Sequence, residues 1–231
     1  MSEDSNTHYT NLQPNQRPVP IVAIGGSAGG QNAMSELLSH LPSDTGLAYV
    51  YIQHLPPDYD SKLDFIFSAK TAMPVVEAAH LMQVKSNHVY VIPSNKDMEV
   101  VDSVLVLMPR KPQQKLHHPI DQFFTSLAER QKDGAIGIVL SGMASDGTLG
   151  LKAIKVAGGI TFAQDETAAF QSMPQTAIGE GVVDIVLSPK EMAIELVRLS
   201  KQAHVFRLTG ETADASQDDT ENQGFKIYFF L

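Results

Sequence analysis

Three polar residues that follow apolar runs have the side chains of a serine hydrolase. Ser27 lies in GGSAGG (25–30), which matches G-x-S-x-G between a predicted strand and a predicted helix. His54 follows the run LAYVYIQ (47–53), and Asp146 lies in SGMASDG (141–147). A serine nucleophile, a histidine base and an aspartate that orients the base are the parts needed for acyl transfer. This set therefore predicts a hydrolytic site at one edge of a sheet.

Each of these residues also has a simpler interpretation. The glycines around Ser27 are typical of a tight turn or a phosphate cradle, although the G-x-G-x-x-G spacing is not met and the P-loop lysine is absent. His54 fits a solvated residue or a cap at a strand end, and Asp146 fits the N-cap of the next helix. Their joint placement after three strands favours acyl transfer, while a nucleotide-binding regulator stays an alternative.

The elements that position these residues follow an alternating pattern. Apolar runs at 19–24 and 47–53 are each followed by apolar residues at helical spacing, first Met34, Leu37 and Leu38 and then the stretch 63–67. Such alternation predicts an α/β fold, a doubly wound and mainly parallel sheet with helices on both faces. In such sheets ligands bind beyond the carboxyl ends of the strands, where the three polar residues lie.

The second half of the core contains one interruption. Residues 73–109 consist of short strand-like pieces and predict a small antiparallel excursion at an edge of the sheet. A helix with its apolar face at 120–127, a strand AIGIVL (135–140), a helix 148–157 and a strand ITFAQ (160–164) then resume the alternation. Ser188-Pro189-Lys190-Glu191 has the pattern of a capping box and predicts the start of a last helix.

Composition and charge narrow the class of protein. The chain has 231 residues, 43% of them hydrophobic. Its net charge of −9 argues against a nucleic-acid binder, which is expected to be basic. It has no cysteine, and no apolar run approaches the length of a membrane span. We expect a cytoplasmic protein with one catalytic domain at 19–205, a flexible arm at 1–18 and an acidic tail or linker at 206–231.

Seven motifs in the same order resemble the catalytic domain of the bacterial chemotaxis protein-glutamate methylesterases. They are IVAIGGSAGG, YIQHLPPDYDSKL, HVYVIPSN, HHPIDQFFTSLAE, VLSGMASDGTLGLKAIKVAGG, AQDETAAF and MPQTAIGEGVVDIVL. The resemblance implies that Ser27 is the nucleophile, His54 the base and Asp146 its partner. It also implies oxyanion contacts from the backbone at Met143, to which we add the amide of Ala28.

The resemblance also implies a reaction and its partners. Members of that family hydrolyse glutamate methyl esters on chemoreceptors and release methanol, and they need no metal or organic cofactor. Some members also deamidate receptor glutamines. The common form carries a receiver domain, and we expect the 18 polar residues before the first strand to be too few to form one. The motifs are more similar to the methylesterase segment of hybrids in which a methyltransferase domain follows, so we expect a segment of a longer chain. A catalytically silent docking or regulatory domain is the alternative.

Overall fold

The computed structural model describes residues 19–54, 62–110 and 117–202. The predicted arm at 1–18, and the tail or linker at 206–231, lie outside these residues. Within the described part of the chain, no helix is both long enough and apolar enough to cross a membrane.

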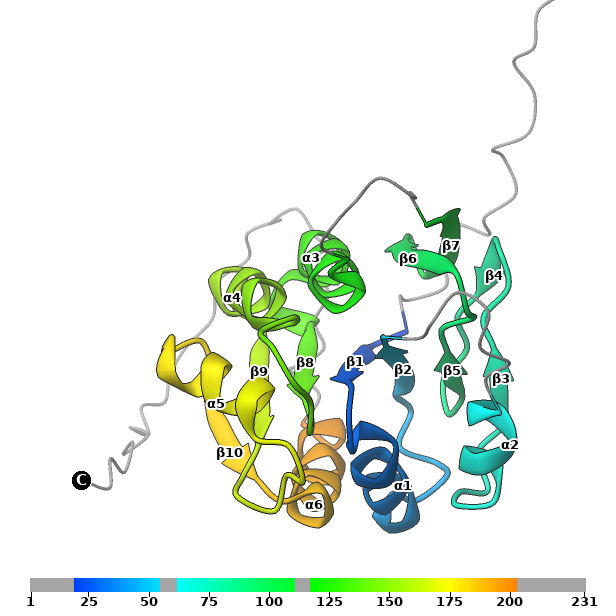
Figure 1. The fold of residues 1–231 in the computed structure, drawn as a ribbon. Coiled ribbons are helices and arrows are strands. Elements are labelled where there is room, and N and C mark those ends of the chain that lie inside the picture. The colour runs from blue at the N-terminus through cyan, green and yellow to red at the C-terminus, as the bar shows by residue number, and fades with distance from the viewer. Residues whose placement is uncertain (1–18, 55–61, 111–116, 203–231) are drawn as a thin grey trace, which may run out of the picture.

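The main sheet has seven strands, all parallel, in the order β10-β9-β8-β1-β2-β5-β3 (Figure 1). Its strands are β1 (Ile21–Gly26), β2 (Ala48–Gln53), β3 (Val75–Glu77), β5 (Val89–Val91), β8 (Ile136–Val139), β9 (Ile160–Gln164) and β10 (Ile185–Leu187). The central strands β1 and β8 are buried along their whole length, as expected for strands covered on both faces. The predicted fold class is confirmed.

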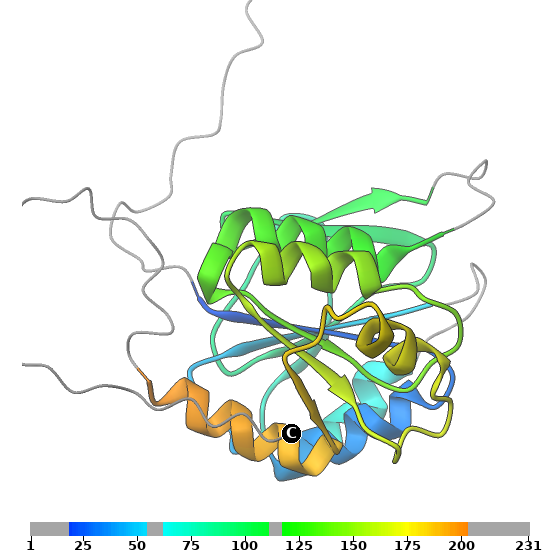
Figure 2. The same cartoon turned by 90° about the vertical axis from the view of Figure 1, so that its left-hand side faces the viewer.

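Helices cover both faces of this sheet. They are α1 (Gly30–His40), α2 (Leu63–Ser68), α3 (Pro119–Gln131), α4 (Thr148–Val156), α5 (Ser172–Gly179) and α6 (Pro189–Ser200), with a short 3-10 turn at Lys132–Gly134. Figure 2 shows α3 and α4 on one face and α1 and α6 on the other. The predicted capping box is present, because Ser188 accepts from the Glu191 amide while the Glu191 side chain accepts from Ser188.

The chain reverses its direction of winding at β1. From β1 it moves to β2 on one side, and it later returns to place β8 on the other side. The loops that leave neighbouring strands at such a switch point diverge and leave a crevice at the carboxyl edge of the sheet. The loops after β1, β2 and β8 carry Ser27, His54 and Asp146, respectively.

The predicted antiparallel excursion is present as a separate sheet of β4 (Met82–Gln83), β7 (Val104–Pro109) and β6 (Lys96–Val101). β6 and β7 form a hairpin whose turn residues Asp102 and Ser103 both have positive φ, as a tight hairpin turn requires. The small sheet packs on α3 through β6. Two pieces of the interrupted region, β3 and β5, instead extend the main sheet in parallel.

Candidate active site

Ser27 lies in the turn that joins β1 to α1. β1 ends at Gly26, Gly29 is the N-cap of α1, and the helix begins at Gly30. The Ser27 amide donates to the Ser141 carbonyl at 3.0 Å, and the Gly30 amide donates to the Ser27 carbonyl at 2.9 Å. The loop after β1 is thereby tied to the loop after β8, and the half-buried Ser27 side chain lies between them.

Gly29 is the residue in this turn that no other amino acid replaces without strain. Its φ is +75°, and a Cβ atom at this position would lie 2.6 Å from Ser141 Oγ. That hydroxyl is itself fixed, since it donates to the Ala28 carbonyl at 2.7 Å and accepts from the Phe170 amide at 3.0 Å. The glycine cluster therefore brings three loops into close contact around Ser27.

Gly29→Ala is expected to lower the free energy of unfolding by at least about 2 kcal/mol, because left-handed strain and the clash with Ser141 add up. Urea denaturation measures this change. Gly179→Ala is the matched control, since a Cβ there meets nothing within 4 Å and the site lies at the end of α5. The control should be neutral or more stable by up to about 1 kcal/mol. Equal stability of the two variants would contradict the close packing.

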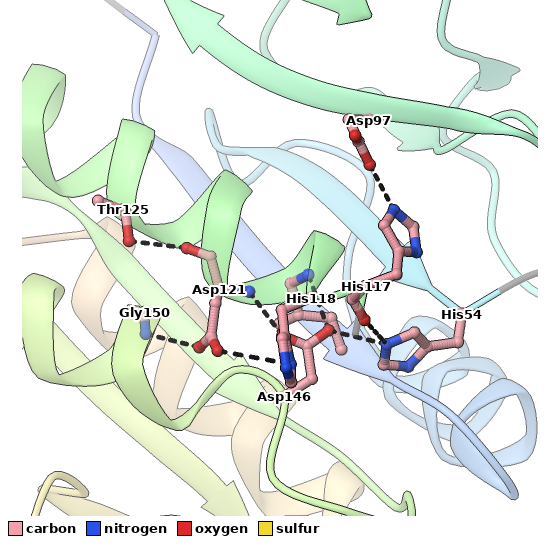
Figure 3. Close-up of polar contacts among 9 residues, drawn as sticks. His54, Asp97, His117, His118, Asp121, Thr125, Asp146 and Gly150 are labelled. Carbon is pink, nitrogen blue, oxygen red and sulfur yellow. Dashed lines mark hydrogen bonds and ion pairs between the residues drawn. The ribbon is translucent and has the colours of Figure 1, made fainter. Parts of the chain in front are cut away.

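His54 immediately follows β2, in register with Ser27. β1 and β2 are paired up to Gly26 and Gln53, so Ser27 and His54 are the next residues on the two neighbouring strands. His54 Nε2 lies 3.1 Å from Asp146 Oδ2 and 3.1 Å from the His117 carbonyl oxygen (Figure 3). Both neighbours accept hydrogen bonds, so they place the imidazole proton on Nε2 and leave Nδ1 as the basic nitrogen.

Asp146 is buried, with 1% of its surface exposed, and its carboxylate lies at the N-terminus of α3. Oδ2 accepts from the Ile120 amide at 3.0 Å and Oδ1 accepts from the Asp121 amide at 2.9 Å. Free amides and the positive end of the helix dipole both stabilise an anion there. The simpler interpretation of Asp146 as the N-cap of the following helix is wrong, because Gly147 is the N-cap of α4 and no side chain caps it.

The surroundings shift the pKa values of this pair in opposite directions. The hydrogen bond to Asp146 raises the pKa of His54 above 6.5, against burial and the charge of Arg110, which lower it. Burial raises the pKa of Asp146, but hydrogen bonds from His54 and from the Asp121 and Ile120 amides outweigh it, and the pKa falls below 3.8. An ionised Asp146 is thus the stable partner of the His54 imidazole.

The hydrogen bond between Ser27 Oγ and His54 is not formed. Among the described residues, neither Ser27 Oγ nor His54 Nδ1 has a hydrogen-bond partner. Such bonds are often long or misaligned in unliganded enzymes and tighten when substrate binds. The amides of Ala28 and Met143 likewise donate to no described residue, which leaves them available to an oxyanion.

Three side chains near His54 offer ligand atoms to a metal ion. His118, Asp121 and Asp146 have such atoms within 4.8 Å of one another. Both Asp146 oxygens already accept backbone amides, and Asp121 Oδ1 accepts from the Gly150 amide at 2.8 Å. Most of these oxygen atoms therefore already accept hydrogen bonds from backbone amides, and we assign the cluster no metal role.

Sequence reasoning did not single out His117 or the N-terminus of α3. The motif HHPID contained the signal, since Pro119 favours the first position of a helix and the amides that follow are free. α5 and β10 were not predicted, although VVDIVL before Ser188 has a strand-like composition. β4 was not predicted either, and β3 and β5 are parallel strands of the main sheet instead of part of the antiparallel excursion. The other predicted helices and strands agree with the structure within a few residues.

Curated relatives match most of the described chain. A protein-glutamate methylesterase/protein-glutamine glutaminase of Burkholderia pseudomallei is 34% identical over 182 residues, which are 78% of this chain and 53% of that protein. One from Desulfitobacterium hafniense is 32% identical over 186 residues, 78% of this chain and 47% of that protein. The chain thus spans about half the length of the curated relatives it matches.

A solved structure and a family model agree with these relatives. The crystal structure of the Thermotoga maritima CheB methylesterase catalytic domain matches with a TM-score of 0.72 and 29% identity, over 78% of this chain and 98% of that chain. The family model described as CheB methylesterase matches residues 22–196. With that fold, these relatives and a match over more than half its length, the chain belongs to the CheB methylesterase family.

Proposed function

We propose that the chain hydrolyses methyl esters of glutamate side chains on chemoreceptors and that Ser27, His54 and Asp146 are its catalytic triad. One observation carries the proposal. His54 follows β2 beside Ser27, and its Nε2 lies 3.1 Å from the buried, ionised Asp146, so its basic nitrogen is free for a serine proton. These contacts support the roles of Ser27 as nucleophile, His54 as base and Asp146 as orienting carboxylate in acyl transfer.

The proposed reaction has two halves. Ser27 Oγ attacks the ester carbonyl carbon while His54 Nδ1 takes its proton, and the Met143 and Ala28 amides stabilise the tetrahedral oxyanion. The intermediate collapses, and methanol leaves with the proton from His54. Water then attacks the glutamyl ester of Ser27 in the same way and restores the free serine. Asp146 stabilises the imidazolium in both halves.

The same steps serve a glutamine side chain. An amide nitrogen would take the place of the methoxy oxygen, accept the proton from His54 and leave as ammonia. Both activities appear in the names of the curated relatives. We therefore include receptor glutamine deamidation in the proposal.

The proposed substrate requires local recognition. The net charge of −9 does not attract the carboxylates of a receptor, so overall electrostatic steering contributes little. The exposed Met143 and Phe170 side chains belong to the two loops that adjoin Ser27 and offer apolar contact. We further propose a cytoplasmic catalytic domain at 19–205 that acts within a longer chain, alongside a methyltransferase domain.

Covalent labelling tests the proposal against a silent docking domain. Phenylmethanesulfonyl fluoride is expected to modify Ser27, as peptide mass spectrometry would show. The rate should fall as the pH drops through the pKa of His54, which lies above 6.5, because the protonated imidazole accepts no proton from serine. A protein that is not labelled, or a labelling rate independent of pH, would count against a Ser27–His54 pair.

A further inference from the structure

We propose that Asp97 and His117 form a positioning pair that fixes the orientation of the His54 imidazole. His117 Nε2 donates to Asp97 Oδ1 at 2.5 Å, and the carbonyl of His117 accepts from His54 Nε2 at 3.1 Å (Figure 3). The inference rests on the proposed esterase function.

The first half of the pair is a buried carboxylate on the small sheet. Asp97 lies on β6 and is 5% exposed, and the His117 side chain is 11% exposed. A buried carboxylate is costly, and it is retained only where hydrogen bonds compensate its lost hydration. Its partner here is the ring of His117, which directly precedes His118, the N-cap of α3. The small sheet therefore holds the segment that enters α3.

His117, the second residue of the pair, contacts His54 through its backbone carbonyl. Its carbonyl oxygen and Asp146 Oδ2 are both 3.1 Å from His54 Nε2 and share one proton. Two acceptors define the ring orientation more narrowly than one, and they direct Nδ1 away from both. The carbonyl dipole also stabilises the imidazolium that forms when Ser27 attacks. Asp97, which holds His117 in place, therefore affects the orientation of the His54 base.

The hydrogen bond that His54 Nε2 donates to the His117 carbonyl also contributes to the pKa of His54. The groups that act on His54 are Asp146 and the His117 carbonyl, which raise its pKa, and burial and Arg110, which lower it. If the carbonyl moves away, the pKa of His54 falls. A loss of packing between β6 and α3 that leaves the His117 carbonyl in place would not lower the pKa of His54.

The test compares Asp97→Ala, Asp97→Asn and Glu99→Ala. Asparagine keeps an oxygen that can accept from His117. Glu99 is the matched control, because it also lies on β6 and also bonds to α3, accepting from Gln122 Nε2 at 2.9 Å, without contact to His54. The assays are the kcat and KM of methyl-ester hydrolysis, the melting temperature, and the His54 titration by NMR of protein labelled with ¹⁵N-histidine.

We expect Asp97→Ala to lower kcat about 10- to 100-fold, since small misplacement of a catalytic group has effects of this size. KM should stay the same and the pKa of His54 should fall. Asp97→Asn and Glu99→Ala should retain turnover within about threefold and the wild-type titration. If Asp97→Ala does not fold, His117→Ala removes the same contact from its other end and should give the same two changes.

Two outcomes would overturn the inference. One is wild-type turnover and an unchanged His54 titration in Asp97→Ala. The other is an equal loss of turnover and melting temperature in Asp97→Ala and Glu99→Ala, which would make the contact a purely structural one. If the wild type hydrolyses no methyl ester, the proposed function fails, yet the His54 titration still decides whether Asp97 positions the imidazole.

Discussion

Replacing Ser27 with alanine is expected to abolish methyl-ester hydrolysis, with a loss in turnover of about 10⁶, the size found when a triad serine is removed. His54→Ala should lose nearly as much. The Ser27→Ala/His54→Ala double variant should be scarcely worse than either single variant, because members of a triad act as one unit. Steady-state rates on a methylated receptor measure all three variants.

Ser145→Ala is the control for the first prediction. Ser145 lies in the exposed part of the loop that carries Asp146, and its replacement should change turnover by less than about twofold. If the losses from Ser27→Ala and His54→Ala multiply in the double variant, the two residues act independently and the triad assignment is wrong.

Asp146→Asn is expected to lower turnover by about three to four orders of magnitude, because an amide in this place favours the wrong imidazole tautomer. If the asparagine donates to His54 Nε2, the proton moves to Nδ1, the nitrogen that must take it from Ser27. The amide also loses an acceptor for the Ile120 or Asp121 backbone, so we expect a stability cost of about 1–3 kcal/mol.

The stability effect of Asp146 has a defined pH dependence. The pKa of Asp146 is lowered in the folded state, so its ionised form stabilises the protein above pH 3.8, the ordinary value. This contribution is lost as the pH falls through the lowered pKa, and the stability difference between wild type and Asp146→Asn should then shrink. Urea denaturation at a series of pH values measures it.

Asp121→Asn separates catalysis from local structure at the N-terminus of α3. Asp121 lies beside Asp146 and accepts from the Gly150 amide, but it does not contact His54. Its replacement should keep turnover within about tenfold of wild type. If Asp146→Asn also stays within about tenfold, Asp146 serves only to hold α3, and the base has no orienting carboxylate.

Local patterns were sufficient to predict most of the fold. Apolar runs of strand length, helical spacing around Leu37 and Phe123, and the capping box at Ser188 each depend on residues close in sequence. The alternation of these elements then predicts a parallel sheet, and the sheet places the ends of β1, β2 and β8 at one edge. The polar residues that follow these three strands, Ser27, His54 and Asp146, are therefore predictable as a site from the sequence.

The sequence patterns could not predict the long-range contacts of the site. The sequence does not state which nitrogen of His54 faces Asp146, because that depends on the Ile120 and Asp121 amides and on the His117 carbonyl, which lies 63 residues away. The contact of Asp97 with His117 depends on how the small sheet packs on α3. α5 has only eight residues and buries only Met173, Pro174 and Ala177, so its apolar pattern is too short to predict a helix.

Release of methanol from a methylated chemoreceptor tests the central claim most directly. The receptor is labelled with radioactive methyl groups in membranes, and volatile methanol is collected after addition of wild-type protein, Ser27→Ala or buffer. The wild type is expected to release methanol in an amount equal to the methyl groups lost, while Ser27→Ala should match buffer. Equal release by wild type and Ser27→Ala, or no release above buffer by folded wild type, would contradict a Ser27-dependent methylesterase.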